Sequence, residues 1–152
     1  MNILIAAIGR AKAGPEKDLT EDYIARLPWR VNLKEIEIKK EADAATRKAK
    51  EGAALLAAVP AGARVVVLDE RGKAQSSAQF AKRLGDWRDG GVRSVAFLIG
   101  GADGHDESVR ARAEMLLSFG AMTWPHMMVR AMLAEQIYRA HSILTNHPYH
   151  RA

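Results

Sequence analysis

The chain has 152 residues, of which 48% are hydrophobic and 27% charged, with a net charge of +5 and no cysteine. This composition is typical of one soluble globular domain, here residues 1–152, that is long enough to bury a core. The lack of cysteine excludes disulfides, thiolate metal sites and a cysteine nucleophile. The longest apolar run, residues 3–8, is far shorter than the roughly 20 residues of a membrane-spanning helix. We therefore expect neither a signal peptide nor a membrane segment, and a cytoplasmic location.

Short apolar runs alternate with longer amphipathic stretches in the order βαβαβαβαβα. This pattern predicts an α/β fold with a mostly parallel sheet and helices on both faces. In the first half we expect a strand at 2–9, a helix at 16–27 that Pro28 ends, a strand at 31–38 and an alanine-rich helix at 41–59. The apolar residues of 31–38 change parity along the run, which indicates either a bulge or an edge strand.

The second half continues the alternation, and its elements begin at local signals such as a capping box formed by Ser76 and Gln79. The expected elements are a central strand at 64–69, a helix from the capping box to Arg88, a strand at 92–99, a short helix from Asp106, a short strand at 114–118, a long helix at 127–146 and a tail at 147–152. The long helix has an apolar face wide enough that we expect part of it to pack on a second subunit.

Ligands of open α/β sheets bind beyond the carboxyl ends of the strands. Three such ends carry glycines that allow backbone amides to approach a ligand, namely residues 68–72, 99–104 and 118–125. The glycine-rich run at 100–104 is not the spaced GxGxxG of dinucleotide folds, so both a plain tight turn and a ligand cradle fit it.

The carboxyl end gathers four of the five histidines among arginines and a tyrosine. These residues are His126, Arg130, Arg139, His141, His147, Tyr149, His150 and Arg151. Such a cluster can attract phosphate, supply a general base or bind a metal, although the lack of nearby carboxylates argues against a metal. The tail fits a simple helix stop at Asn146 and Pro148. A phenol, an imidazole and a guanidinium together favour a functional tail that contacts a phosphate and a stacked base of RNA.

Four segments resemble the RlmH family, which belongs to the SPOUT, or α/β-knot, superfamily and comprises bacterial 23S rRNA (pseudouridine1915-N3)-methyltransferases. The segments are LIGG at 98–101, SFGAMTWPHMMVR at 118–130, AEQIYRAHSI at 134–143 and TNHPYHR at 145–151. The runs IAAIG at 5–9 and VVVLDERGK at 65–73 are compatible with the family. The resemblance covers essentially the whole chain and is most specific in its last third.

The resemblance implies an S-adenosylmethionine-dependent methyltransferase with a deep trefoil knot in its carboxyl-terminal third. It implies a homodimer that methylates N3 of a pseudouridine in large-subunit rRNA of the assembled ribosome, without a metal. The positions that match the family's cofactor-binding segments are Leu68, Gly100, Phe119, Gly120, Ala121, Met122, Thr123 and Trp124.

Methyl transfer to a ring nitrogen also requires that the nitrogen lose its proton. The residues that we expect at this step are His126, Arg130, Tyr149, His150 and Arg151. We expect the tail to fold over a pocket, that of the partner subunit, with Arg151 on a phosphate and Tyr149 or His150 placing the base. The alternatives are a non-catalytic RNA- or ribosome-binding module with a degenerate cofactor pocket, and a small hydrolase that uses the histidines.

Overall fold

The computed structural model describes residues 1–39 and 43–150. Within this part of the chain the strands form a five-stranded sheet of order β2-β1-β4-β3-β5, in which every neighbouring pair is parallel. The strands are β1 (Asn2–Ile8), β2 (Arg30–Ile36), β3 (Arg64–Ala74), β4 (Ser94–Ile99) and β5 (Met115–Ser118). The expected α/β fold with a parallel sheet is confirmed.

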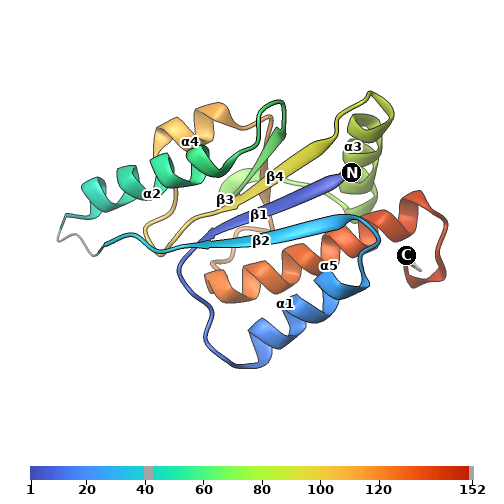
Figure 1. Cartoon of the computed structure of the whole chain (residues 1–152), viewed down its shortest axis with the longest axis horizontal. Helices are drawn as coiled ribbons and strands as arrows, with labels where there is room; N and C mark the ends of the chain where they lie inside the picture. Colours follow the sequence, from blue (N-terminus) through green and yellow to red (C-terminus); the bar gives the residue numbers. More distant parts are fainter. Residues whose placement is uncertain (40–42, 151–152) are drawn as a thin grey trace.

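Helices cover both faces of the sheet, as expected (Figure 1). They are α1 (Pro15–Arg26), α2 (Ala44–Ala58), α3 (Ser77–Asp89), α4 (Glu107–Arg112), α5 (His126–Leu144) and the short 3-10 helix η1 (Pro148–His150). In Figure 1, α2 and α4 lie above the sheet, whereas α1 and α5 lie side by side below it. Helix α3 packs against α5.

The apolar core has two parts, one on each face of the sheet. Ile3, Ile5 and Phe97 belong to the part beneath α1, α3 and α5, whereas Leu4 and Leu98 belong to the part beneath α2 and α4. Because strands β1 and β4 and residues 65–68 of β3 are covered on both faces, their sequences are almost continuously apolar. The sheet is therefore a rigid platform whose carboxyl ends position the loops described below.

Strand β2 lies at the edge of the sheet and pairs only with β1, in a register without a shift. Of the two explanations for its irregular apolar pattern, the edge position is therefore correct and the bulge is not. Val31 and Leu33 pack on one face of the sheet and Ile36 on the other. One-sided pairing leaves all three only partly buried.

Strand β3 runs beyond the expected end at Asp69, as far as Ala74. Its register with β5 shifts between Leu68 and Lys73, and both of these residues align with Leu117. Gly72 makes the second contact possible, because a Cβ atom there would lie 2.7 Å from the carbonyl oxygen of Leu116. The segment after Asp69, expected to follow the end of the strand, is thus a bulge within a longer strand.

Most helix limits agree with the sequence signals within a few residues. The capping box of α3 is present, with Ser76 Oγ accepting from the Gln79 amide at 3.1 Å and Gln79 Oε1 accepting from the Ser76 amide at 2.9 Å. Helix α2 begins after its N-cap Asp43, and the expected start at Glu41 lies outside the described residues. Helix α5 ends at Leu144, and Asn146 adopts a φ of 57° that stops it.

In residues 1–39 and 43–150, no helix combines the length and the hydropathy needed to cross a membrane.

Candidate functional site

A cleft of about 810 Å³ lies at the carboxyl ends of the strands, and we call it the glycine-turn cleft. Three backbone segments enclose it: the end of β3 with its bulge, the turn after β4, and the loop between β5 and α5. Of the expected cofactor-binding positions, those that line it are Leu68, Gly100, Phe119, Gly120, Met122, Thr123 and Trp124. Ala121 is not among the lining residues. The fold thus brings together three strand ends that the sequence singles out separately.

The glycine-rich segment forms a tight turn and also lines the cleft, so its two interpretations are compatible. The Gly104 amide donates to the Gly101 carbonyl oxygen at 3.1 Å, and Gly104 has a φ of +78° that favours glycine. An ion pair of 2.7 Å between Asp103 and Arg47 fastens the turn to α2. The backbone of the turn therefore faces the cleft from a fixed position.

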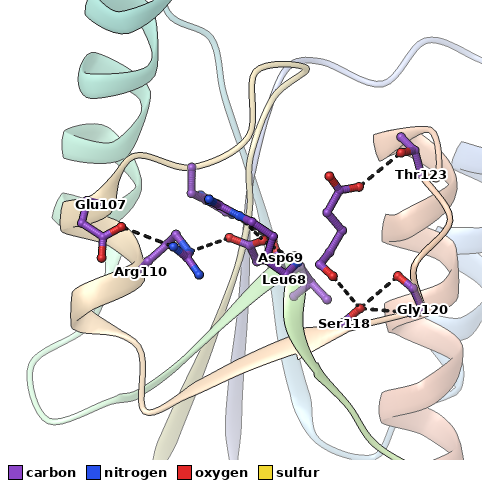
Figure 2. Close-up of polar contacts among 10 residues, drawn as sticks. Leu68, Asp69, Glu107, Arg110, Ser118, Gly120 and Thr123 are labelled. Carbon is purple, nitrogen blue, oxygen red and sulfur yellow. Dashed lines mark hydrogen bonds and ion pairs between the residues drawn. The ribbon is translucent and has the colours of Figure 1, made fainter.

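Side-chain contacts tie the loop after β5 to the bulge of β3 (Figure 2). Ser118 Oγ donates to the Glu70 carbonyl oxygen at 3.2 Å and accepts from the Gly120 amide at 3.1 Å. Thr123 Oγ1 donates to the Glu70 carboxylate at 3.2 Å. Gly120 has a φ of +108°, which a residue with a side chain rarely adopts. The loop shape thus depends on Ser118, Gly120 and Thr123.

Asp69, where the bulge of β3 begins, ties this strand to α4 on the opposite side (Figure 2). Its carboxylate accepts from the Arg71 amide at 2.8 Å and lies 2.9 Å from Nε of Arg110. Burial alone would raise the pKa of Asp69, but the hydrogen bonds from Arg71 and the charges of Arg71 and Arg110 outweigh it, so the pKa is lowered. Asp69 is therefore a charged anchor beneath the cleft.

His105, the one histidine outside the carboxyl-terminal cluster, also lines the cleft, although the sequence analysis does not single it out. The residue is 6% exposed, and its Nε2 lies 3.1 Å from the carbonyl oxygen of Leu68. Burial lowers its pKa, which keeps the ring neutral at neutral pH. The only sequence signal for it is its position directly after the glycine-rich turn.

The structure separates two of the expected catalytic residues. His126, the first residue of α5, lines the glycine-turn cleft. Arg130, which is 2% exposed, instead forms a 2.6 Å ion pair with Glu35 and donates to the carbonyl oxygens of Ile8 at 3.1 Å and Gly9 at 2.8 Å. Arg130 thus lines a different cavity, of about 670 Å³, between α1 and β2. Its contacts anchor the loop that follows β1.

The described part of the tail packs against α1 and the middle of α5. The hydroxyl of Tyr149 lies 2.9 Å from that of Tyr23 and donates to the Glu135 carboxylate at 3.0 Å. Burial and these two hydrogen bonds raise the pKa of Tyr149, so the phenol remains protonated. Glu135 follows His126 by nine residues, which is about 13 Å along a helix. Tyr149 therefore lies away from the cleft of its own chain.

The remaining tail residues are only partly covered by the structure. His150 ends η1 and is partly buried, whereas Arg151 lies outside the described residues. In the part of the chain that the structure describes, no three His, Asp or Glu side chains are grouped so that they could hold a metal ion.

A groove of about 780 Å³ runs between α1, the start of α3 and α5, and Tyr23 and Glu135, which bind the tail, line it. We call it the α1–α5 groove. Leu19 and Met128 also line it and are exposed despite their size. Met122 and Trp124, on the loop over the glycine-turn cleft, are exposed as well, Met122 to 74%. Of these four exposed side chains, only Met128 belongs to the last helix, whose apolar face is expected to pack on a second subunit.

Comparison with known proteins gives matches over nearly the whole chain. A family model described as "Predicted SPOUT methyltransferase" matches residues 1–150. The curated protein "Ribosomal RNA large subunit methyltransferase H" of Paramagnetospirillum magneticum is 61% identical over 151 residues, 99% of each chain. The protein of the same name from Rhodospirillum centenum is 57% identical over 152 residues, the whole of both chains.

The chain therefore belongs to the RlmH family of SPOUT methyltransferases, which confirms the resemblance noted from its motifs. Among solved structures, the SpoU methyltransferase AviRb of Streptomyces viridochromogenes, in complex with AdoMet, has a TM-score of 0.46 and 10% identity. That match covers 93% of this chain and 60% of AviRb.

Proposed function

We propose that this chain transfers a methyl group from S-adenosylmethionine to large-subunit rRNA, at N3 of a pseudouridine in the assembled ribosome. The observation that carries the proposal is the convergence of Leu68, Gly100 and the segment 119–124 apart from Ala121 around one cleft, in a chain of this family. Action on ribosomes also places the protein in the cytoplasm.

The glycine-turn cleft fits the cofactor in size and chemistry. Its volume of about 810 Å³ lies within the roughly 300 to 1,000 Å³ of small-molecule sites. Trp124 and Val129 offer apolar walls for the adenine base and the carbon chain of the cofactor, and Gly100 and Gly120 expose backbone groups for hydrogen bonds. Nδ1 of His105 is a buried polar atom without a partner beside them. These residues would hold the cofactor.

The cofactor supplies a methyl group on a positively charged sulfur, ready for in-line displacement. The chain must hold the acceptor nitrogen about 3 to 3.5 Å from that methyl group and remove its proton. His126 is the candidate for the proton within the same chain, because it lines the cleft and is half-buried at the start of α5. Arg130 is proposed to act indirectly, by anchoring the loop after β1 through Glu35.

We further propose a homodimer in which the tail of one subunit completes the cleft of its partner. The separation of Tyr149 from the cleft of its own chain supports this, as do the exposed Leu19 and Met128 beside the tail. In this arrangement Tyr149 and His150 place the base and Arg151 contacts a phosphate. Leu19→Asp should shift the protein from dimer to monomer in sedimentation velocity. Asp22→Ala, on the exposed side of α1, should leave the dimer intact.

We also propose that this chain has the domain organisation and the knot of its family. Residues 1–152 form a single domain, and the carboxyl-terminal third is threaded as a deep trefoil knot. A parallel sheet in which β3 lies between β4 and β5 supports the SPOUT arrangement, and the match of one family model to residues 1–150 supports a single unit.

Binding and turnover distinguish the enzyme from a non-catalytic ribosome-binding module. Calorimetry with S-adenosylmethionine should give micromolar binding, and ribosomes from cells lacking the protein should accept labelled methyl groups when protein and cofactor are added. Ribosome binding without cofactor binding would support the non-catalytic module and refute the enzyme.

A further inference from the structure

His105 is buried between two backbone walls of the glycine-turn cleft. We propose that it is a positioning residue for the cofactor, which holds the end of β3 and the turn after β4 at the separation that binding requires. This inference rests on the proposed function, because it assumes that S-adenosylmethionine occupies this cleft.

The first wall is held by a hydrogen bond. His105 Nε2 lies 3.1 Å from the carbonyl oxygen of Leu68, the residue at which β3 leaves its first register with β5. A carbonyl oxygen only accepts, so Nε2 must carry the ring proton of the neutral imidazole. The side chain thereby fixes the point where β3 turns into its bulge.

The second wall is held by packing. A Cβ atom on Gly100 would lie 3.1 Å from Cε1 of His105 and 3.2 Å from the Gly104 carbonyl oxygen. The imidazole therefore lies directly beside the backbone of the turn. It limits how closely the turn can approach β3. Both walls contain positions that match the family's cofactor-binding segments, Leu68 and Gly100.

The other ring nitrogen has no hydrogen-bond partner among the described residues. The carbonyl of Leu98 and the carboxylates of Asp69 and Asp106 are the further groups that influence the ring. With Nε2 protonated, Nδ1 is a bare acceptor in a buried site. His105 is thus a rigid spacer with one satisfied donor, rather than a group that exchanges protons with a substrate.

The experiment compares two replacements of His105. His105→Met keeps an apolar side chain of similar length but has no donor for Leu68, whereas His105→Gln places an amide donor near the position of Nε2. Calorimetry with S-adenosylhomocysteine should show about tenfold weaker binding for His105→Met, the factor expected if the two walls keep the separation that binding requires in only about a tenth of the molecules. His105→Gln should recover most of the affinity. His141→Met, which makes the same change near the far end of α5, is the matched control and should bind as the wild type does.

Steady-state kinetics distinguish a positioning role of His105 from a general effect on the stability of the fold. The KM for S-adenosylmethionine of His105→Met should rise about tenfold while kcat at saturating cofactor stays within about twofold, since loss of the preformed cleft weakens ground-state and transition-state binding alike. Equal cofactor affinity in His105→Met and wild type would overturn the inference. Failure of the wild type itself to bind cofactor would instead refute the proposed function.

If His105→Met does not fold, NMR spectroscopy of the wild-type protein tests the inference instead. The ring nitrogens of His105 should give the NMR pattern of a neutral imidazole with the proton on Nε2, and should shift saturably when S-adenosylhomocysteine is added. A signal that stays unchanged at saturation, or that shows the proton on Nδ1, would contradict the proposed contact.

Discussion

The guanidinium of Arg130 lies 2.6 Å from the carboxylate of Glu35, beneath the loop that links β1 to α1. Glu35 also accepts from the Ala11 amide at 2.6 Å, and Arg130 donates to the Ile8 and Gly9 carbonyl oxygens. Burial alone would raise the pKa of Glu35, but the hydrogen bonds from Ala11 and Arg130 lower it. One ion pair therefore joins α5, the edge strand β2 and the carboxyl end of β1.

Loss of this ion pair should mainly affect stability. Arg130→Ala leaves Glu35 and two carbonyl groups without their donor, and should reduce the free energy of unfolding in urea by about 2 to 4 kcal/mol. Lys82→Ala, which removes the exposed pair with Asp86, should cost at most about 0.5 kcal/mol. Similar losses in the two variants would show that Arg130 is not the anchor described here.

The role of the tail in catalysis can be tested by removing, one at a time, the hydroxyl groups of Tyr149 and Tyr23. Both Tyr149→Phe and Tyr23→Phe eliminate their shared 2.9 Å contact. If Tyr149 places the base, Tyr149→Phe should lower kcat by about tenfold, the effect of losing one hydrogen bond, and Tyr23→Phe should have less effect. Equal rates in the two variants would mean that the contact serves packing alone.

Removal of residues 147–152 is a stronger change to the same segment. We expect methyl transfer to be abolished and cofactor affinity to stay nearly intact, because the described part of the tail lies outside the glycine-turn cleft of its own chain. Calorimetry and a methyl-transfer assay on the same preparation measure both quantities. Unchanged turnover would reject the assignment of Tyr149, His150 and Arg151.

Gly120 allows a test of the loop over the cleft. Gly120 and Gly62 both have positive φ values, +108° and +77°, and a Cβ atom on either would meet nothing within 4 Å. Replacement of either glycine by alanine should therefore lower the free energy of unfolding by about 1 kcal/mol, because alanine is strained at a positive φ. Only Gly120→Ala should also weaken S-adenosylmethionine binding, because Gly62 lies outside the cleft. Equal affinities in calorimetry would argue against a role of this loop in binding.

The stability of the protein should depend on pH through His105. Burial lowers its pKa below the usual 6.5, so the unfolded chain takes up the proton first as the pH falls. The free energy of unfolding should therefore be highest above about pH 6.5 and decrease below it, until the folded pKa is passed. His141, whose pKa is also lowered by burial and by the charge of Arg88, adds to the same trend.

Urea unfolding at about pH 7.5 and 5.5 measures this decrease across the expected window. His105→Gln should make the decrease smaller, since glutamine does not titrate, and His141→Gln reports the separate contribution of the other ring. A decrease in His105→Gln as large as that of the wild type would contradict the buried, neutral state of His105.

Local signals in the sequence are sufficient to predict most of the fold. The capping box at Ser76, the stop near Asn146 and the continuous apolar runs of β1 and β4 depend on neighbouring residues, so their structures were predictable. The extension of β3 to Ala74 was not, because it requires pairing with Leu117 of β5. A register shift of this kind leaves no periodic pattern in the sequence.

The candidate site was predictable where the backbone forms it and less so where long side chains do. Leu68 and Gly100 follow from the positions of strand ends. Arg130, however, was grouped with His126, four residues earlier, although its side chain reaches Glu35, 95 residues away in the sequence. His105 was missed because a single histidine after a turn has no distinguishing pattern, and its burial depends on packing against Gly100.

Mass spectrometry of large-subunit rRNA from cells with and without this protein tests the central claim most directly. The fragment that carries the target pseudouridine should be lighter by one methyl group in cells that lack the protein. Re-expression of the wild type, but not of the chain without residues 147–152, should restore the heavier fragment. Identical rRNA fragments in both strains would contradict the assignment of this chain as an rRNA methyltransferase.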